Sequence, residues 1–313
     1  MVEVAERASA PGMRVYELRP APPYAFDLAL TAMHFSPSVV LDATDPVGGR
    51  YQRALRLAGR ELLLAIQARG STEAPVLRLE VRGEGIDDEV GQAAVAFARH
   101  VFRLDLDPAP FDAIAARDPV LGALAGRFPG LRPVLVPDPF EALLFAIIGQ
   151  QINVRFARTL KQRLVELANQ RLVIDGASYP LFPTPAWLAA LEPEELAAHQ
   201  FSRQKASYLV GLSRAVQEGA LDLEAIGRLP QEEAIAALTA HKGIGRWTAE
   251  YLLMRGYGAP DSIPAADLGL RDSIGKAYLG RRASEAEVRS IAEGWAGQRS
   301  WAAFLWWILL HVK

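Results

Sequence analysis

The 313-residue chain contains no cysteine, which excludes disulfide bonds and an iron–sulfur cluster held by cysteine thiolates. It has only five histidines, and their scattered positions do not match the spacing of zinc ligands, so no metal site built from side chains is predicted. Long apolar runs are also missing: Ala142–Ile148 and Phe304–Leu310 are too short to cross a bilayer, and residues 1–12 lack the apolar core of a signal peptide. We therefore expect a soluble, cytoplasmic protein.

The chain also lacks a large excess of charge of one sign. Its formal net charge of −2 does not by itself indicate a nucleic-acid partner. The basic residues are nevertheless concentrated in four stretches, Gln150–Leu164, Phe201–Ala215, His241–Tyr257 and Gly269–Ala283. Each stretch alone is typical of a solvated helix face, but a fold that gathered them on one side would neutralise phosphates there.

The first third of the chain has the pattern of a sheet. Helical patterns cover Pro23–Ala32 and Asp87–Phe102. Short runs bounded by Pro, Gly or polar residues predict strands at Arg14–Arg19, Ser38–Thr44, Tyr51–Leu57, Glu61–Arg69 and Val76–Arg82. Residues 13–103 are thus expected to form an antiparallel sheet with two helices, after a frayed tail at residues 1–12. Nothing in this part carries recognisable chemistry.

From Leu104 onward the strand signals nearly vanish and the pattern is helical. The segment Asp138–Glu141 supplies an N-cap, an N1 proline and an N3 glutamate, which are typical of a helix start. That helix ends before Gln150 and Gln151, and Asn153 can cap the next helix, which is predicted to run to residue 170. The two glutamines therefore lie at a corner between helices, where polar side chains can point away from the core.

A short turn rich in glycine joins two further helical patterns, Gln231–Ala240 and Trp247–Gly256. Glycines in the turn, His241-Lys242-Gly243-Ile244-Gly245, permit positive φ and a close approach of the backbone to another molecule. The free N–H groups of the second helix, together with Lys242 and Arg246, favour an anion such as a phosphate. The glycine spacing alone is equally typical of a connector in a helical bundle, and it lacks the context of a dinucleotide-binding motif.

Two aromatic residues and one carboxylate follow the turn. Trp247 and Tyr251 are four residues apart and share a helix face, as core residues often do. Asp267 precedes the helical pattern Leu268–Leu279, where aspartate is also a preferred N-cap. Taken singly, each of these residues has an ordinary structural interpretation.

Together, the run KGIGRWTAEYLLMRGYG (242–258) and Asp267 resemble the helix-hairpin-helix DNA glycosylases, and most closely the 3-methyladenine DNA glycosylase II (AlkA-type) family. The likeness extends upstream to PFEALLFAIIGQQINVRFARTL (139–160) and covers roughly the last two-thirds of the chain. It implies an α+β, mainly helical fold with an N-terminal antiparallel α/β sheet domain. Two helical domains, residues 104–230 and 231–313, would flank the active-site cleft.

The resemblance also implies an activity, which is to flip an alkylated purine such as 3-methyladenine out of double-stranded DNA and hydrolyse its N-glycosidic bond. Trp247, Tyr251 and Gln150 would form the base pocket, because electron-rich π faces hold a cationic base by stacking and cation–π attraction. Gln151 occupies the position of the wedge that fills the gap in the DNA. Family members can have an apolar residue at that position.

Asp267 is, by the same resemblance, the catalytic carboxylate; Asp272 and Asp261 are the nearest competitors. A carboxylate there would stabilise positive oxocarbenium character on the sugar and orient or deprotonate the attacking water. Bifunctional relatives have a lysine nucleophile where this chain has Trp247. The enzyme is therefore expected to be monofunctional and to leave an abasic site.

The hairpin implies contacts with the DNA backbone, and the segment FSRQKASYL (201–209) resembles another family segment near DNA. The backbone-binding residues would be Lys242, Gly243, Ile244, Gly245, Arg246, Thr248, Arg203 and Lys205. Family hairpins often hold a monovalent cation on backbone carbonyls; no other cofactor is implied. We expect a monomer that does not bind membranes, and we interpret Trp301, Trp306 and Trp307 mainly as packing residues of the apolar C-terminal helix.

Two alternatives remain open from the sequence. A glycosylase for deaminated or oxidised bases would share every motif described above. A non-catalytic helix-hairpin-helix protein would bind DNA with the hairpin alone, and it would need neither Asp267 nor an aromatic wall.

Overall fold

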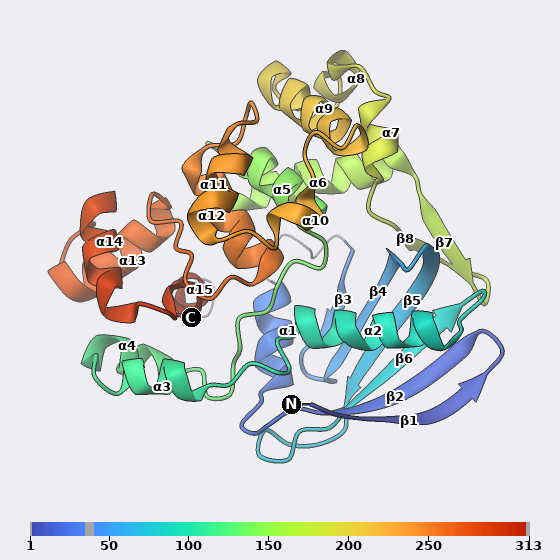
Figure 1. Cartoon of the computed structure of the whole chain (residues 1–313), viewed down its shortest axis with the longest axis horizontal. Coiled ribbons are helices and arrows are strands. Elements are labelled where there is room, and N and C mark those ends of the chain that lie inside the picture. Colours follow the sequence, from blue (N-terminus) through green and yellow to red (C-terminus); the bar gives the residue numbers. More distant parts are fainter. Residues whose placement is uncertain (1, 35–40, 311–313) are drawn as a thin grey trace. The chain divides into compact units, whose positions relative to one another are not determined.

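In the computed structural model, which describes residues 2–34 and 41–310, the chain forms two compact units (Figure 1). Unit 1 is built from residues of the ranges 1–107, 128–134 and 165–182, and unit 2 from residues of the ranges 108–127, 135–164 and 183–313. The two helical domains expected on either side of residue 230 both fall mainly in unit 2. The boundary at residue 230 therefore stays a prediction.

Unit 1 contains a six-stranded antiparallel sheet in the order β1-β2-β6-β5-β4-β3. Its strands are β1 (Glu3–Ala10), β2 (Met13–Arg19), β3 (Ala43–Asp45), β4 (Arg50–Leu57), β5 (Arg60–Ala68) and β6 (Leu77–Gly83). Strand β5 is buried on both faces, with Leu62, Leu64 and Ile66 on one face and Leu63 on the other. The helices of this unit are α1 (Phe26–His34) and α2 (Asp88–Val101), and α2 runs across the sheet in Figure 1.

The expected tail at residues 1–12 is wrong, because Glu3–Ala10 forms strand β1. It pairs with β2 in register from Glu3 opposite Arg19 to Ala10 opposite Met13. As an edge strand, β1 buries little of its surface, so its sequence EVAERASA does not need the apolar alternation on which the prediction relied. The other predicted strands are observed near their expected bounds, except Ser38–Thr44: residues 38–40 lie outside the described residues, and only the end of the predicted strand overlaps β3.

A second sheet was missed. Strands β7 (Arg171–Ile174) and β8 (Ala177–Pro180) form a hairpin within the stretch predicted to be helical. Leu172, Ile174 and Tyr179 of this hairpin pack against Ala54, Leu63 and Leu181, so the hairpin belongs to unit 1. The signal was present in Asp175-Gly176, both with positive φ (51° and 76°), since Asp-Gly between two short runs is typical of a tight hairpin turn.

Unit 2 is helical. Its helices are α3 (Ala109–Ala115), α4 (Pro119–Ala125), α5 (Pro139–Gly149), α6 (Val154–Ala168, whose last turn is in unit 1), α7 (Pro185–Ala189), α8 (Pro193–Ala197), α9 (Arg203–Gln217), α10 (Leu223–Ile226), α11 (Gln231–Thr239), α12 (Arg246–Leu252), the π-helix η2 (Leu253–Tyr257), α13 (Leu268–Leu279), α14 (Glu285–Ala292), the 3₁₀-helix η3 (Glu293–Trp295) and α15 (Arg299–Leu309).

Helix α5 is the central element of unit 2, because every residue from Phe140 to Ile148 is buried. The predicted caps are confirmed: the Asp138 side chain accepts the Phe140 N–H at 2.8 Å, and Asn153 accepts the Phe156 N–H at 2.9 Å. The helix contacts α9, α12 and η2. Its C-terminal end therefore brings the glutamine corner next to the hairpin helix.

Candidate active site

The hairpin between α11 and α12 depends on one glycine for its conformation. Gly243 has φ +97°, and a Cβ atom there would lie 2.7 Å from Cγ of Tyr208. Gly245 does not have positive φ; it is the N-cap of α12, and its side-chain position faces open space. Ile244 is buried and its N–H donates to the His241 carbonyl at 3.1 Å. The Ile244 N–H is thus used inside the hairpin, and the expected contact of Ile244 with DNA stays a prediction.

The glutamine corner is bonded directly to the hairpin. Nε2 of Gln150 donates to the Gly243 carbonyl at 2.9 Å and to Oγ1 of the buried Thr248 at 3.2 Å. Gln151, by contrast, is exposed and has positive φ (59°). Gln150 was expected to contact the base and Thr248 the DNA backbone. In the structure the Gln150 amide nitrogen and the Thr248 hydroxyl join the two segments, and both expected contacts stay predictions.

The aromatic residues form a continuous stack. The rings of Trp247 and Tyr251 are 5.6 Å apart between centroids and nearly parallel, at 28°. Trp307 of α15 lies 5.9 Å from Tyr251 on the same cluster. Burial raises the pKa of Tyr251 to about 12, so its hydroxyl is neutral at ordinary pH. The stack therefore presents uncharged π surface.

Asp267 is held beside this stack. It is the N-cap of α13, where its Oδ1 accepts the Leu270 N–H at 3.0 Å. The same oxygen accepts a hydrogen bond from Nε1 of Trp307, also at 3.0 Å. Oδ2 of Asp267 accepts no hydrogen bond from any described residue, so one carboxylate oxygen is anchored and the other is available.

Trp307 is the site residue that the sequence did not reveal. It was interpreted as packing because it lies in the apolar run of α15, and no local signal separates it from its neighbour Trp306. Its partner Asp267 is 40 residues away in the chain. Only the packing of α13 against α15 brings the two side chains together.

The competing carboxylates are engaged elsewhere. Asp261 forms an ion pair with Arg299 and accepts the Gly297 N–H at 2.6 Å, which fixes the start of α15. Asp272 pairs with Lys276 at 2.7 Å and with Arg282 at 3.3 Å. These cations hold the pKa of Asp272 below its usual range. Neither carboxylate lies against the aromatic stack.

The expected backbone-binding cations differ in availability. Arg246 forms ion pairs with Glu232 at 3.0 Å and Glu250 at 2.9 Å, and these carboxylates raise the pKa of its guanidinium. Lys205 donates from Nζ to the Ile148 carbonyl at 2.6 Å, and burial lowers the pKa of its amine. Both side chains are thus occupied within the protein. Lys242 and Arg203 are exposed.

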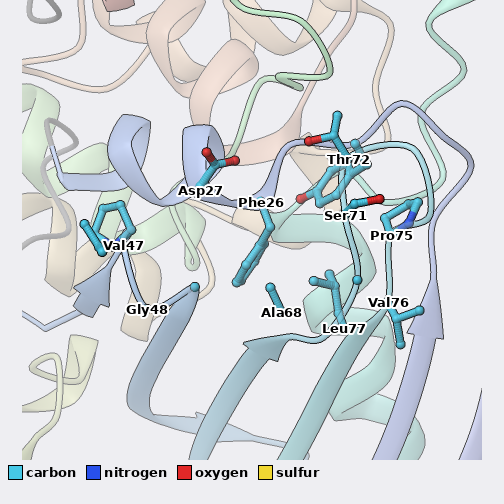
Figure 2. Close-up of a pocket in the computed structure, with 14 residues that line it drawn as sticks. Phe26, Asp27, Val47, Gly48, Ala68, Ser71, Thr72, Pro75, Val76 and Leu77 are labelled. Atoms are coloured by element: carbon cyan, nitrogen blue, oxygen red, sulfur yellow. The ribbon is translucent and has the colours of Figure 1, made fainter.

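One cavity lies away from these residues. It has a volume of about 430 Å³ and is enclosed by Phe26, Asp27, Thr72 and the turn Pro46–Gly49 of unit 1 (Figure 2). Asp27 is its only charged lining residue, and the cavity contains none of the predicted site residues. A lone carboxylate with apolar and hydroxyl neighbours does not provide an acid–base pair or a nucleophile.

Neither a metal cluster nor a membrane span is found in residues 2–34 and 41–310. No group of three or more His, Asp or Glu side chains in this part of the chain is arranged to hold a metal ion. None of its helices has both the length and the apolar character needed to cross a bilayer.

Residues 144–297, which include the hairpin, Trp247, Tyr251 and Asp267, match the model of the HhH-GPD superfamily of base excision DNA repair proteins. The DNA-3-methyladenine glycosylase of Bacillus subtilis is 35% identical over 218 residues, which cover 69% of this chain and 72% of that protein. The chain belongs to this family of DNA-3-methyladenine glycosylases.

Two further comparisons agree. DNA-3-methyladenine glycosylase 2 of Escherichia coli is 36% identical over 192 residues, covering 61% of this chain and 63% of that protein. The structure of the 3-methyladenine DNA-glycosylase from Archaeoglobus fulgidus superposes with a TM-score of 0.83 at 24% identity, over 95% of this chain and 98% of that one. The expected α+β fold with an N-terminal antiparallel sheet is confirmed.

Proposed function

We propose that this protein is a monofunctional DNA glycosylase that flips alkylated purines of the 3-methyladenine type out of double-stranded DNA and hydrolyses their N-glycosidic bonds. The observation that carries the proposal is the Asp267 carboxylate, anchored through one oxygen beside the stack of Trp247, Tyr251 and Trp307. A protein that only bound DNA phosphates would need neither the carboxylate nor the stack.

The stack accounts for the choice of base. A purine alkylated at a ring nitrogen carries positive charge, and the neutral rings of Trp247 and Tyr251 attract it through their π faces. Such a pocket selects for a cation without reading every edge of the base. Gln150 can still contribute its side-chain oxygen to the base, since its nitrogen is bonded to the hairpin.

Asp267 acts on the sugar and the water. As the bond between C1′ and the base nitrogen breaks, its electron pair passes to the base and neutralises the base's charge. The anionic Oδ2 stabilises the positive character that develops on the deoxyribose, and it orients or deprotonates the water that adds to C1′. Because the leaving base is already cationic, the step needs no strong general acid.

Two features set the products and the mode of binding. Trp247 stands where bifunctional relatives have a lysine, so no Schiff base forms and the backbone of the abasic product stays intact. Gln151, exposed at the tip of the corner, enters the space left by the flipped nucleotide. We expect the protein to act as a monomer.

A monovalent cation at the hairpin remains part of the proposal. The carbonyls of Gly243 and His241 each accept a hydrogen bond inside the protein, which leaves each oxygen a second lone pair for a cation. The ion would help to neutralise a phosphate near the hairpin.

The test is base release from duplex DNA treated with a methylating agent. The wild type should release 3-methyladenine, and Asp267→Asn should reduce the rate at least about 100-fold, the lower end of acid–base contributions. Asparagine still accepts the Leu270 and Trp307 hydrogen bonds through its oxygen, so binding to duplex DNA with a non-cleavable abasic analogue should be retained. If both proteins bind this DNA but neither releases a base, the glycosylase proposal fails.

A further inference from the structure

Most cations of the four basic stretches are already engaged within the protein. Ion pairs join Arg281 to Glu287 and Arg282 to Asp272, as they join Arg246 to its two glutamates. The concentration of basic residues in the sequence therefore overstates the charge that a polyanion would meet. An engaged guanidinium offers fewer free N–H donors to a phosphate, and its carboxylate partner repels the phosphate.

Three basic side chains of these stretches differ from the others in their exposure and contacts. Within the part of the chain that the structure describes, Arg155, Arg203 and Lys242 are exposed, and their side chains make no hydrogen bond or ion pair. One of them comes from each of the first three stretches. The fourth stretch, Gly269–Ala283, contributes none: its Arg271 donates to the Ala283 carbonyl, and its other cations are in ion pairs.

The contacts of unit 2 join the elements that carry these three cations to the glutamine corner. Arg155 lies in the first turn of α6, four residues after Gln151. Arg203 begins α9, and its neighbour Lys205 donates to the carbonyl of Ile148, at the end of α5. Lys242 precedes Gly243, whose carbonyl accepts the hydrogen bond from Gln150. Each cation is therefore attached to an element that is bonded to, or continuous with, the glutamine corner.

We propose that Arg155, Arg203 and Lys242 form a phosphate-binding surface around Gln151, and that this surface grips the DNA backbone near the flipped nucleotide. The inference rests on the proposed function and deepens it, since it assigns Arg155 a DNA contact and removes the Arg246 and Lys205 side chains from that role. The occupant is a DNA backbone because separate cations on three elements suit a chain of regularly spaced phosphates. Binding here breaks no existing ion pair.

The salt dependence of DNA binding tests this surface. The probe is a duplex with a tetrahydrofuran abasic analogue, which the enzyme cannot process, and the affinity is measured over a range of KCl concentrations. Replacing any one of the three residues by alanine should reduce the slope of log K against log [KCl] by about 0.9, and the triple variant should reduce it by about 2.7. Arg155→Lys should restore the slope, because it keeps the charge.

Arg281→Ala and Arg282→Ala are matched controls, because they remove the same charge from exposed residues that are in ion pairs. Their slopes should equal that of the wild type. The proposal is overturned if Arg155→Ala has the same slope as these controls. Base release is measured separately. If the slopes change as expected but the wild type releases no base, the phosphate-binding surface is supported and the glycosylase activity is refuted. If the wild type releases base but the slopes do not change, only the phosphate-binding surface is refuted.

Discussion

Nε1 of Trp307 donates a 3.0 Å hydrogen bond to Oδ1 of Asp267, so the aromatic stack and the carboxylate are joined by a direct contact. The Leu270 N–H binds the same oxygen, and the two donors together fix the plane of the carboxylate. The position of Oδ2 relative to the aromatic rings is then fixed. We infer that Trp307 positions Asp267 as well as contributing to the wall of the pocket.

Replacing Trp307 by phenylalanine should slow base release roughly tenfold under single-turnover conditions, because a hydrogen bond to a charged acceptor contributes about 1.5 kcal/mol or more. Phenylalanine keeps an aromatic face at this position, so affinity for abasic-analogue DNA should change little. Trp306→Phe is the matched control, since the buried Nε1 of Trp306 has no hydrogen-bond partner among the described residues. It should lower the melting temperature without slowing the chemical step. Equal rates for Trp307→Phe and the wild type would argue against the positioning role.

Gln150→Leu should weaken binding to DNA, because it removes the hydrogen bonds that hold the hairpin next to the glutamine corner. Thr248→Val removes one of the same bonds from the other side. In a double-mutant cycle on DNA affinity the two changes should therefore be non-additive, with a coupling of about 0.5–1.5 kcal/mol. If Gln150 reads the base instead, its replacement would alter the relative rates on different damaged bases and would show no coupling to Thr248.

The structure also explains which parts of the site were visible in the sequence. The hairpin and the corner could be predicted because glycines, caps and helical periodicity are local signals. Trp307 could not, because its contact with Asp267 joins residues 40 apart and depends on how α13 packs against α15. The same limit applies to the prediction of charged contacts. Arg246 is visible in the sequence, but only the fold shows that its guanidinium already forms ion pairs with Glu232 and Glu250.

The elements of the fold also divide into those with a local sequence signal and those that depend on distant contacts. Strands with an apolar run bounded by polar residues, such as β5, were predicted because they bury several consecutive side chains. Strand β1 lies at an edge and is mostly exposed, so its sequence carries little pattern. The β7–β8 hairpin had a local signal in its Asp175-Gly176 turn, but its packing against Ala54 of β4 and Leu63 of β5 joins residues that are distant in sequence.

Tyr251 should contribute to the loss of stability at high pH. Burial raises the pKa of Tyr251 to about 12, above the value of 10.0 for an exposed tyrosine. The unfolded chain therefore loses this proton at lower pH than the folded protein does. The stabilisation is fully present below pH 10 and is lost as the pH rises toward 12. Tyr251→Phe should flatten this decline, which urea unfolding at pH 9 and pH 11 measures; identical declines in the two proteins would contradict the assignment.

The ion pair between Lys161 and Glu141 should be essential for the stability of unit 2. Its side chains are 1% and 0% exposed, and it joins α6 to α5, the helix that ends at the glutamine corner. Lys161→Met removes the buried cation that faces the Glu141 carboxylate, so we expect a loss of about 3–5 kcal/mol in the free energy of unfolding. The double variant with Glu141→Leu should recover much of this loss, because it removes the buried anion together with the buried cation. Urea denaturation of the two variants distinguishes a buried charge from simple packing: if packing alone were responsible, the second substitution would add to the destabilisation.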